Sequence, residues 1–198
     1  MKSIDEAVLE VDTVARYRYL AEFIGFDETD AAAIHQLAGY LAPHINRIVE
    51  RTYEKLLAYD ATARHFLPRQ HGFDGELPAS LAALSADDAQ IQFRKEHLSR
   101  YLMHLLGHAY NDKMAEYLDM VGKMHTPQAG SREIDVPLVQ MNALMGLLSD
   151  CLLTQIMELD LDAATKIDAV RSWNKLLWIQ NDLIGRHYQA DAAGVSSG

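Results

Sequence analysis

The sequence predicts an all-α domain of about eight helices. Apolar residues recur at helical spacing along most of the 198 residues, and no segment alternates apolar and polar residues as a half-buried strand would. Gly25, Pro43 and Pro68 stand between periodic segments, where they mark helix boundaries. The length is ample for a single hydrophobic core. We therefore expect one domain over residues 1–192 and a disordered tail over residues 193–198.

Four helices are expected in the first third of the chain. Gly25 suits the end of the first helix, and the side chain of Asp27 or Thr29 can cap the second. Pro43 fits the first turn of the third helix, and a short fourth helix ends at Pro68. The expected spans are 13–26, 27–41, 43–57 and 61–67.

Four further helices follow a stretch that contains several glycines and prolines. Ser85 and Asp88 predict the start of the first of them, and Gly107 closes it. The next one ends just before Pro127, because a proline disfavours the helical conformation of the residue that precedes it. The expected helices span 85–106, 111–125, 136–159 and 162–190, with loops over 69–78 and 126–134.

Composition and charge exclude several classes of partner. The 28 acidic and 18 basic residues give a formal charge of 18 − 28 = −10 with neutral histidines. This balance, without any basic cluster interleaved with aromatics, argues against nucleic acid or an anionic membrane as partner. No signal peptide is visible, and no apolar stretch approaches the roughly 20 residues that span a bilayer. The single Cys151 excludes an intramolecular disulfide. We expect a soluble, cytoplasmic protein.

His125 is the most informative candidate for chemistry. It follows apolar residues at positions 117, 118, 121 and 124, so an imidazole stands at the end of a buried helix face. A core histidine bonded to a carbonyl gives the same local pattern as a metal ligand does. The rest of the chain has to decide between these two interpretations.

Two of the three metal sites common in helical domains find little support. A di-iron carboxylate bundle needs Glu-x-x-His, and no glutamate here has a histidine three residues later. His97, His104 and His108 share one helical stripe and could bind zinc, but no nearby carboxylate completes the ligand set. Solvated or half-buried histidines would give the same spacing.

The third kind of metal site is a haem site, and the chain contains the residue types that such a site needs. Haem needs one axial imidazole, an apolar slot between helices and, for oxygen, a hydrogen-bond donor on the distal side. Tyr53 lies on the apolar side of its helix, and Phe66 could pack flat on a macrocycle. Leu98 and Leu102 could form the roof of the slot. Plain core roles for Tyr53 and Phe66 fit the same pattern.

Several segments match a known family in the same order along the chain. They are Tyr53-Glu54-Lys55-Leu56-Leu57 with Ala61, Phe66 and Leu67; His97-Leu98 with Leu102, Gly107, Tyr110-Asn111 and Met114; Val121-Gly122-Lys123-Met124-His125; and Leu176-Leu177 with Asn181-Asp182-Leu183 and Tyr188. Through these segments the chain resembles the sensor-globin lineage, which comprises the globin domains of globin-coupled sensors and the single-domain protoglobins. The similarity covers roughly residues 15–190, and the helix before Gly25 is similar to the extra leading helix of these proteins.

The resemblance implies a globin-like fold of about eight helices with an extra N-terminal helix. It also implies a haem b (iron protoporphyrin IX) with His125 as the iron ligand and Tyr53 as the distal group that contacts bound oxygen. Phe66 would pack on the ring, Leu98 would be the apolar distal residue, and Phe93 or Arg94 would stand at the distal gate. The other pocket residues that we expect are Leu102, Val121, Met124 and Met141.

The expected function is reversible binding or sensing of a diatomic gas, with oxygen first and carbon monoxide and nitric oxide as further ligands. We expect a gas binder rather than an enzyme, although a haem enzyme acting on nitric oxide or peroxide stays an alternative. A cofactor-free helical module that dimerises is the other alternative, and a missing Soret band would identify it. The dimer interface of such a module would be formed by the last two helices, through positions 144, 147, 148, 152 and 156 and 170, 173, 177 and 184. Sensor-globin relatives pair through the same helices, so we expect a homodimer for a haem protein too.

Overall fold

The computed structural model describes residues 1–129 and 133–194. All regular structure in these residues is helical, which confirms the predicted fold class. It comprises ten α-helices, of which α4 and α6 are single turns of four residues, and four short 3-10 turns. None of the helices in these residues is both long enough and apolar enough to cross a bilayer.

Each of the eight expected helices has a counterpart in the structure. The helices are α2 (Thr13–Ile24), α3 (Glu28–Gln36) with α4 (Ala38–Leu41), α5 (Ile45–Leu57), α6 (Asp60–Ala63), α7 (Ala89–Gly107), α8 (Asp112–Lys123), α9 (Leu138–Glu158) and α10 (Ala163–Gly194). The 3-10 turns span Ala42–His44, Arg64–Phe66, Leu81–Ala83 and Pro127–Ala129.

The boundaries differ from expectation at several places, each for a local reason. Helix α1 (Glu6–Val11) is additional, and it buries no residue, so no apolar pattern could reveal it. Helix α7 begins at Ala89, because the Asp88 carboxylate accepts a hydrogen bond from the Ser85 amide (2.7 Å) and closes a turn ahead of the helix. Helix α8 ends at Lys123, two residues before His125. Helix α10 includes residues 193 and 194, and the rest of the expected tail, 195–198, lies outside the described residues.

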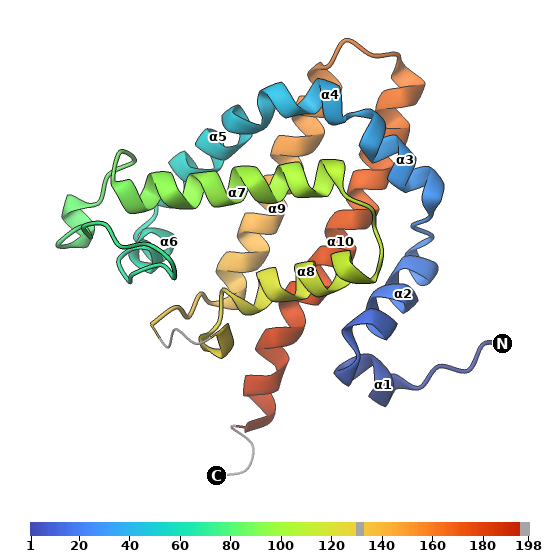
Figure 1. Cartoon of the computed structure of the whole chain (residues 1–198), viewed down its shortest axis with the longest axis horizontal. Coiled ribbons are helices and arrows are strands. Elements are labelled where there is room, and N and C mark those ends of the chain that lie inside the picture. The colour runs from blue at the N-terminus through green and yellow to red at the C-terminus, as the bar shows by residue number, and fades with distance from the viewer. Residues whose placement is uncertain (130–132, 195–198) are drawn as a thin grey trace.

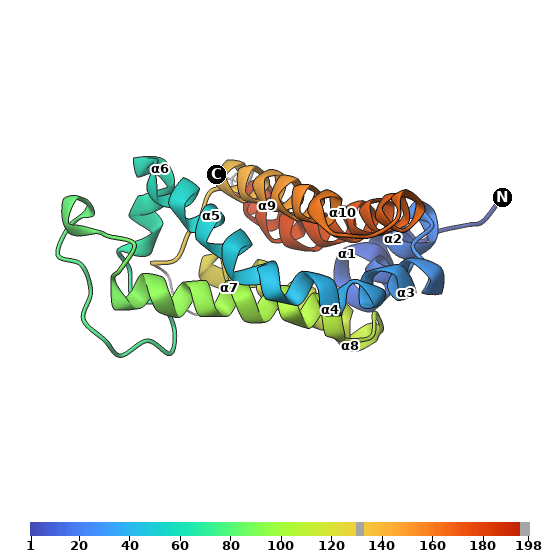
Figure 2. The same cartoon turned by 90° about the horizontal axis from the view of Figure 1, so that it is seen from above.

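The helices are arranged in crossing layers. Figure 1 shows α9 and α10 running side by side across α5, α7 and α8, and Figure 2 shows that α9 and α10 lie on one side of α7 and α8. Helix α5 packs on both α7 and α9, while α10 packs on α3, α8 and α9. The space enclosed by α5, α7, α8, α9 and α10 is therefore bounded by segments that are far apart in the sequence.

Helix α5 illustrates how the sequence pattern places a side chain at this space. Its buried residues follow helical spacing, so one face of the helix points inward and the other carries the charges. The inward face ends with Tyr53, which is 5% exposed. The full set of buried residues is Ile45, Ile48, Val49, Thr52 and Tyr53.

Helix α10 is held in place by polar contacts as well as by its apolar face. The Asp30 carboxylate of α3 accepts hydrogen bonds from Ser172 Oγ (2.8 Å) and Lys175 Nζ (2.7 Å). Asp182 accepts two hydrogen bonds from the guanidinium of Arg16 in α2, at 2.5 and 3.0 Å. These contacts hold α10 in place, and α10 forms one side of the enclosed space.

Most of the apolar positions that we expected at a dimer interface lie in the core instead. They face α3, α5 and α8 because α9 and α10 must bury an apolar stripe against the rest of the domain. The buried positions are Leu148, Leu152, Ile156, Trp173, Leu177 and Ile184, and the half-buried ones are Leu144, Leu147 and Val170.

Candidate functional site

A cavity of about 610 Å³ lies between α5, α7, α8, α9 and α10. This volume falls within the range of about 300–1,000 Å³ that is typical of ligand and cofactor sites. The expected site residue Leu102 is buried in the core outside the cavity wall. The other nine expected residues all line the cavity: Tyr53, Phe66, Phe93, Arg94, Leu98, Val121, Met124, His125 and Met141.

The main chain holds His125 in the turn that follows α8. Its amide donates to the Gly122 carbonyl (3.1 Å), and its own carbonyl accepts from the Val136 amide (3.0 Å). The imidazole Nδ1 lies 2.8 Å from the Val121 carbonyl oxygen. Because a carbonyl can only accept, Nδ1 carries the proton and Nε2 keeps its lone pair. The turn therefore presents a fixed imidazole with a free nitrogen.

The electrostatic surroundings of His125 favour its neutral form. Burial lowers the pKa of the imidazole to about 4, the nearby positive charge of Arg94 acts in the same direction, and the hydrogen bond to Val121 opposes both. At pH 7 the ring is therefore uncharged. Neutral imidazole is the form that binds transition metals.

Tyr53 and Phe66 lie side by side on another part of the wall. Their ring centroids are 5.7 Å apart, and both side chains are 5% exposed. Burial raises the pKa of Tyr53, and the charge of Arg94 partly opposes this shift. The hydroxyl thus stays protonated at neutral pH and can donate a hydrogen bond into the cavity.

Phe93 and Arg94, between which the sequence could not choose, both line the cavity. The Arg94 guanidinium lies over the Phe66 ring, 4.7 Å from its centroid, and donates a hydrogen bond to the side chain of Gln70. The Phe93 ring packs edge-on against His97, with centroids 4.2 Å apart. The two neighbouring side chains therefore make different contacts at the same wall of the cavity.

Sequence reasoning named Arg94 and His97 for separate reasons but missed that they belong to one polar stripe on α7. Gln90, Arg94, His97 and Tyr101 recur at helical spacing, and all but Gln90 line the cavity. Gln90 is fully buried and donates from Nε2 to the carbonyls of Phe66 (2.7 Å) and Pro68 (3.0 Å). The signal was present as polar residues at i, i+4, i+7 and i+11 of one helix. It was overlooked because Arg94 came from the resemblance and His97 from the histidine spacing, while Gln90 and Tyr101 were not considered.

The three histidines considered for zinc do not converge. His97 lines the cavity, whereas His104 and His108 stack on each other with ring centroids 3.7 Å apart. In the described part of the chain, no group of three or more histidine, cysteine or acidic residues is arranged to hold a metal ion.

A comparison with known protein families identifies the family of this chain. A family model described as Protoglobin matches residues 13–193, which is most of the 198-residue chain. The chain belongs to the protoglobin family. The resemblance found in the sequence is thereby confirmed, and membership implies a haem cofactor and the binding of gaseous ligands. A search of curated proteins finds no significant match.

The residues of this protoglobin fit a haem. The cavity is walled largely by apolar side chains from α8, α9 and α10, and His125 offers a neutral nitrogen donor at its edge. Two buried polar atoms of the wall, Tyr101 Oη and Gln180 Oε1, lack a hydrogen-bond partner among the described residues. Buried polar atoms normally have partners, so these two have the capacity to contact a group bound in the cavity.

Proposed function

We propose that this protoglobin binds haem b with His125 as the iron ligand and takes up a diatomic gas, oxygen foremost, on the side of Tyr53. One observation carries the proposal: the His125 imidazole is held by the Val121 carbonyl so that its lone-pair nitrogen remains free beside an apolar cavity. A carbonyl partner on the second nitrogen is the usual support of a metal-binding histidine.

The absorption spectrum of the purified protein tests this proposal. We expect a Soret band in the ferric and ferrous forms that shifts when oxygen or carbon monoxide is added. A protein that was supplied with haem and still gave no Soret band would overturn the proposal and favour a cofactor-free helical module.

When bound, the haem supplies an iron atom with one open coordination position for the gas. The side chains of the cavity determine what that position favours. Tyr53 is buried and protonated, so its hydroxyl can donate a hydrogen bond to a polar ligand. The apolar side chains of Leu98, Met141 and Met145 line the same cavity and exclude water. This combination favours oxygen, which accepts hydrogen bonds well, over the less polar carbon monoxide.

Replacing Tyr53 with phenylalanine should speed the release of oxygen and hardly change the affinity for carbon monoxide. A neutral hydrogen bond contributes about 0.5–1.5 kcal/mol, so its loss raises the oxygen dissociation rate by about twofold to tenfold. Stopped-flow measurement of both gases checks this. Tyr59→Phe is the matched control, since Tyr59 is 54% exposed and lies outside the cavity wall. Equal oxygen dissociation rates in the wild type and Tyr53→Phe would remove Tyr53 from this role.

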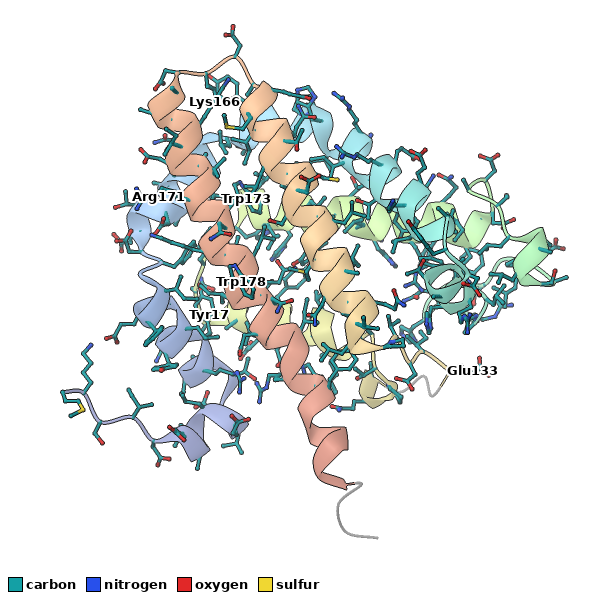
Figure 3. All side chains as sticks on the ribbon, turned by 180° about the vertical axis from the view of Figure 1, so that it is seen from behind. Tyr17, Glu133, Lys166, Arg171, Trp173 and Trp178 are labelled. Carbon is teal, nitrogen blue, oxygen red and sulfur yellow. The ribbon has the colours of Figure 1, made fainter. Side chains whose placement is uncertain are left out.

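We also propose that two copies of the chain pair through the outer faces of α9 and α10. Figure 3 views this side of the molecule, where the two helices lie in front of the other elements and Trp178 is labelled on α10. Four apolar side chains of these helices are more than half exposed: Val139, Met157, Ile167 and Trp178. Their spacing, 18 residues in α9 and 11 residues in α10, places each pair on one face of its helix, and exposed apolar side chains on one face are typical of interaction sites.

The variant Trp178→Glu should shift the protein from dimer to monomer, because a carboxylate cannot be buried at an apolar interface without a partner. Sedimentation velocity at several concentrations measures the change. Met103→Glu is a suitable control, because Met103 is a partly exposed apolar residue of α7, which lies on the other side of the domain. A wild-type protein that stays monomeric at all concentrations would refute the pairing.

A further inference from the structure

The wall of the cavity is divided by polarity. Helices α8, α9 and α10 contribute mainly apolar side chains, among them Val121, Met141 and Leu148. The arginine side chains and, apart from His125, the histidine side chains come instead from α7 and from the segment after α6 that faces it. They are Arg94, His97 and Arg100 of α7 and His65 and His71 of the facing segment, where Gln70 also lines the cavity.

The polar part of the wall opens to solvent. Of its residues, His71, Gly72 and Arg100 are exposed, so the cavity opens between α7 and the segment after α6, and Met124, in the turn after α8, is the other exposed lining residue. Leu148 and Gln180 line the same cavity and are only 3% and 2% exposed, so they mark its closed end. The cavity therefore has an open cationic end and a closed, largely apolar end.

The charge at the open end is not balanced from within the wall. The lining residues include no aspartate or glutamate, although the chain as a whole carries a formal charge of −10. Neither Arg94 nor Arg100 forms an ion pair with a carboxylate of the described residues. Arg94 rests on the Phe66 ring and Gln70, which are both uncharged.

The neighbouring histidines respond to this positive field. Burial lowers the pKa of His97, and the charges of Arg100 and Arg94 lower it further, while Glu96 opposes them. The pKa of His65 is lowered by burial and by Arg64 and Arg94, and Asp135 opposes the shift. Further positive charge is thus disfavoured at this end, and a negative group would be stabilised there.

We infer that the open end of the cavity binds the two carboxylates of the porphyrin, with Arg94 as the principal partner and Arg100 as the second. A guanidinium can hold a carboxylate through two parallel hydrogen bonds, which gives both strength and orientation. The porphyrin would then lie with its apolar edge toward Leu148 and its charged edge at the opening. This inference rests on the proposed haem function and extends it to the residues that orient the ring.

Two metal-free porphyrins separate the carboxylate contacts from the rest of the site. Protoporphyrin IX carries both carboxylates, and its dimethyl ester has the same ring without the charges. Binding to the haem-free protein can be followed by the fluorescence of either porphyrin. Arg94→Met should weaken the binding of the diacid by about tenfold, as expected for the loss of one charge-assisted contact, and leave the binding of the diester unchanged.

Matched variants make the result specific. Arg171→Met removes an exposed arginine of α10 that lies outside the cavity wall, so it should change neither affinity (Figure 3). Arg94→Lys keeps the positive charge and should retain most of the preference for the diacid. Arg100→Met alters an exposed side chain without touching the core, so it reports on the charge even if Arg94→Met folds poorly.

The possible outcomes are distinct. The carboxylate assignment is wrong if Arg94→Met weakens the binding of both porphyrins equally, or if neither arginine variant weakens the binding of the diacid. The haem proposal stands in both cases. If neither porphyrin binds the wild-type protein, the haem proposal itself fails.

Discussion

His125→Ala is expected to lose the five-coordinate ferrous haem spectrum of the wild-type protein. The imidazole is the one neutral nitrogen donor whose lone pair is fixed by the turn after α8, and its removal leaves an apolar wall at that place. Loss of a residue that merely supports a metal ligand lowers metal affinity by about 10–100-fold, and loss of the ligand itself should exceed that. Absorption spectra of the ferrous protein and the rate of haem transfer to an acceptor protein measure the effect.

Free imidazole provides the sharpest control for this variant. It fits the space left by the side chain, so adding it to His125→Ala should restore the five-coordinate spectrum in part. His108→Ala replaces an exposed histidine outside the cavity wall and should leave the spectrum unchanged. An unaltered spectrum in His125→Ala would assign the proximal position to another residue.

Elements that bury an apolar stripe could be predicted from the sequence, and those without one could not. Helix α5 carries its apolar residues at helical spacing and was placed correctly. Helix α1 buries nothing and forms because Asp5 caps it, its carboxylate accepting from the Ala7 amide (3.0 Å), so it was missed. The start of α7 was misplaced because the same residue types, Ser85 and Asp88, close either a turn or a helix.

The sequence singled out His125 as a candidate, but an imidazole at the end of an apolar helix fits a core histidine as well as a metal ligand, and only the resemblance to the sensor globins favoured the ligand. Where the role of a residue depends on packing, the sequence could not decide. Leu102 and Leu98 carry the same kind of apolar signal, yet only Leu98 lines the cavity, because the packing of α7 decides which of them faces it. The Oε1 atom of Gln180, which lacks a partner among the described residues, could be recognised only after α10 had been placed against α8 and α9.

Gly122 brings the His125 turn against α10. A Cβ at this position would lie 2.7 Å from Ile184 Cα and 3.1 Å from the Leu183 carbonyl oxygen, both backbone atoms. No real structure tolerates such an approach, so α8 and α10 would have to separate. Because the Gly122 carbonyl accepts the His125 amide, that separation would also displace the imidazole.

Gly122→Ala should therefore destabilise the fold by about 1–3 kcal/mol, the usual cost of overpacking a close contact, and speed haem loss as well. Thermal unfolding and the rate of haem transfer measure the two effects. Gly185→Ala is the matched control: it lies beside Ile184 in α10, a Cβ there meets nothing within 4 Å, and alanine favours a helix over glycine by up to about 1 kcal/mol. Replacing glycine with alanine should thus stabilise α10 at position 185 and separate α8 from α10 at position 122. A Gly122→Ala protein as stable as Gly185→Ala would mean that the close approach of α8 and α10 does not hold His125 in place.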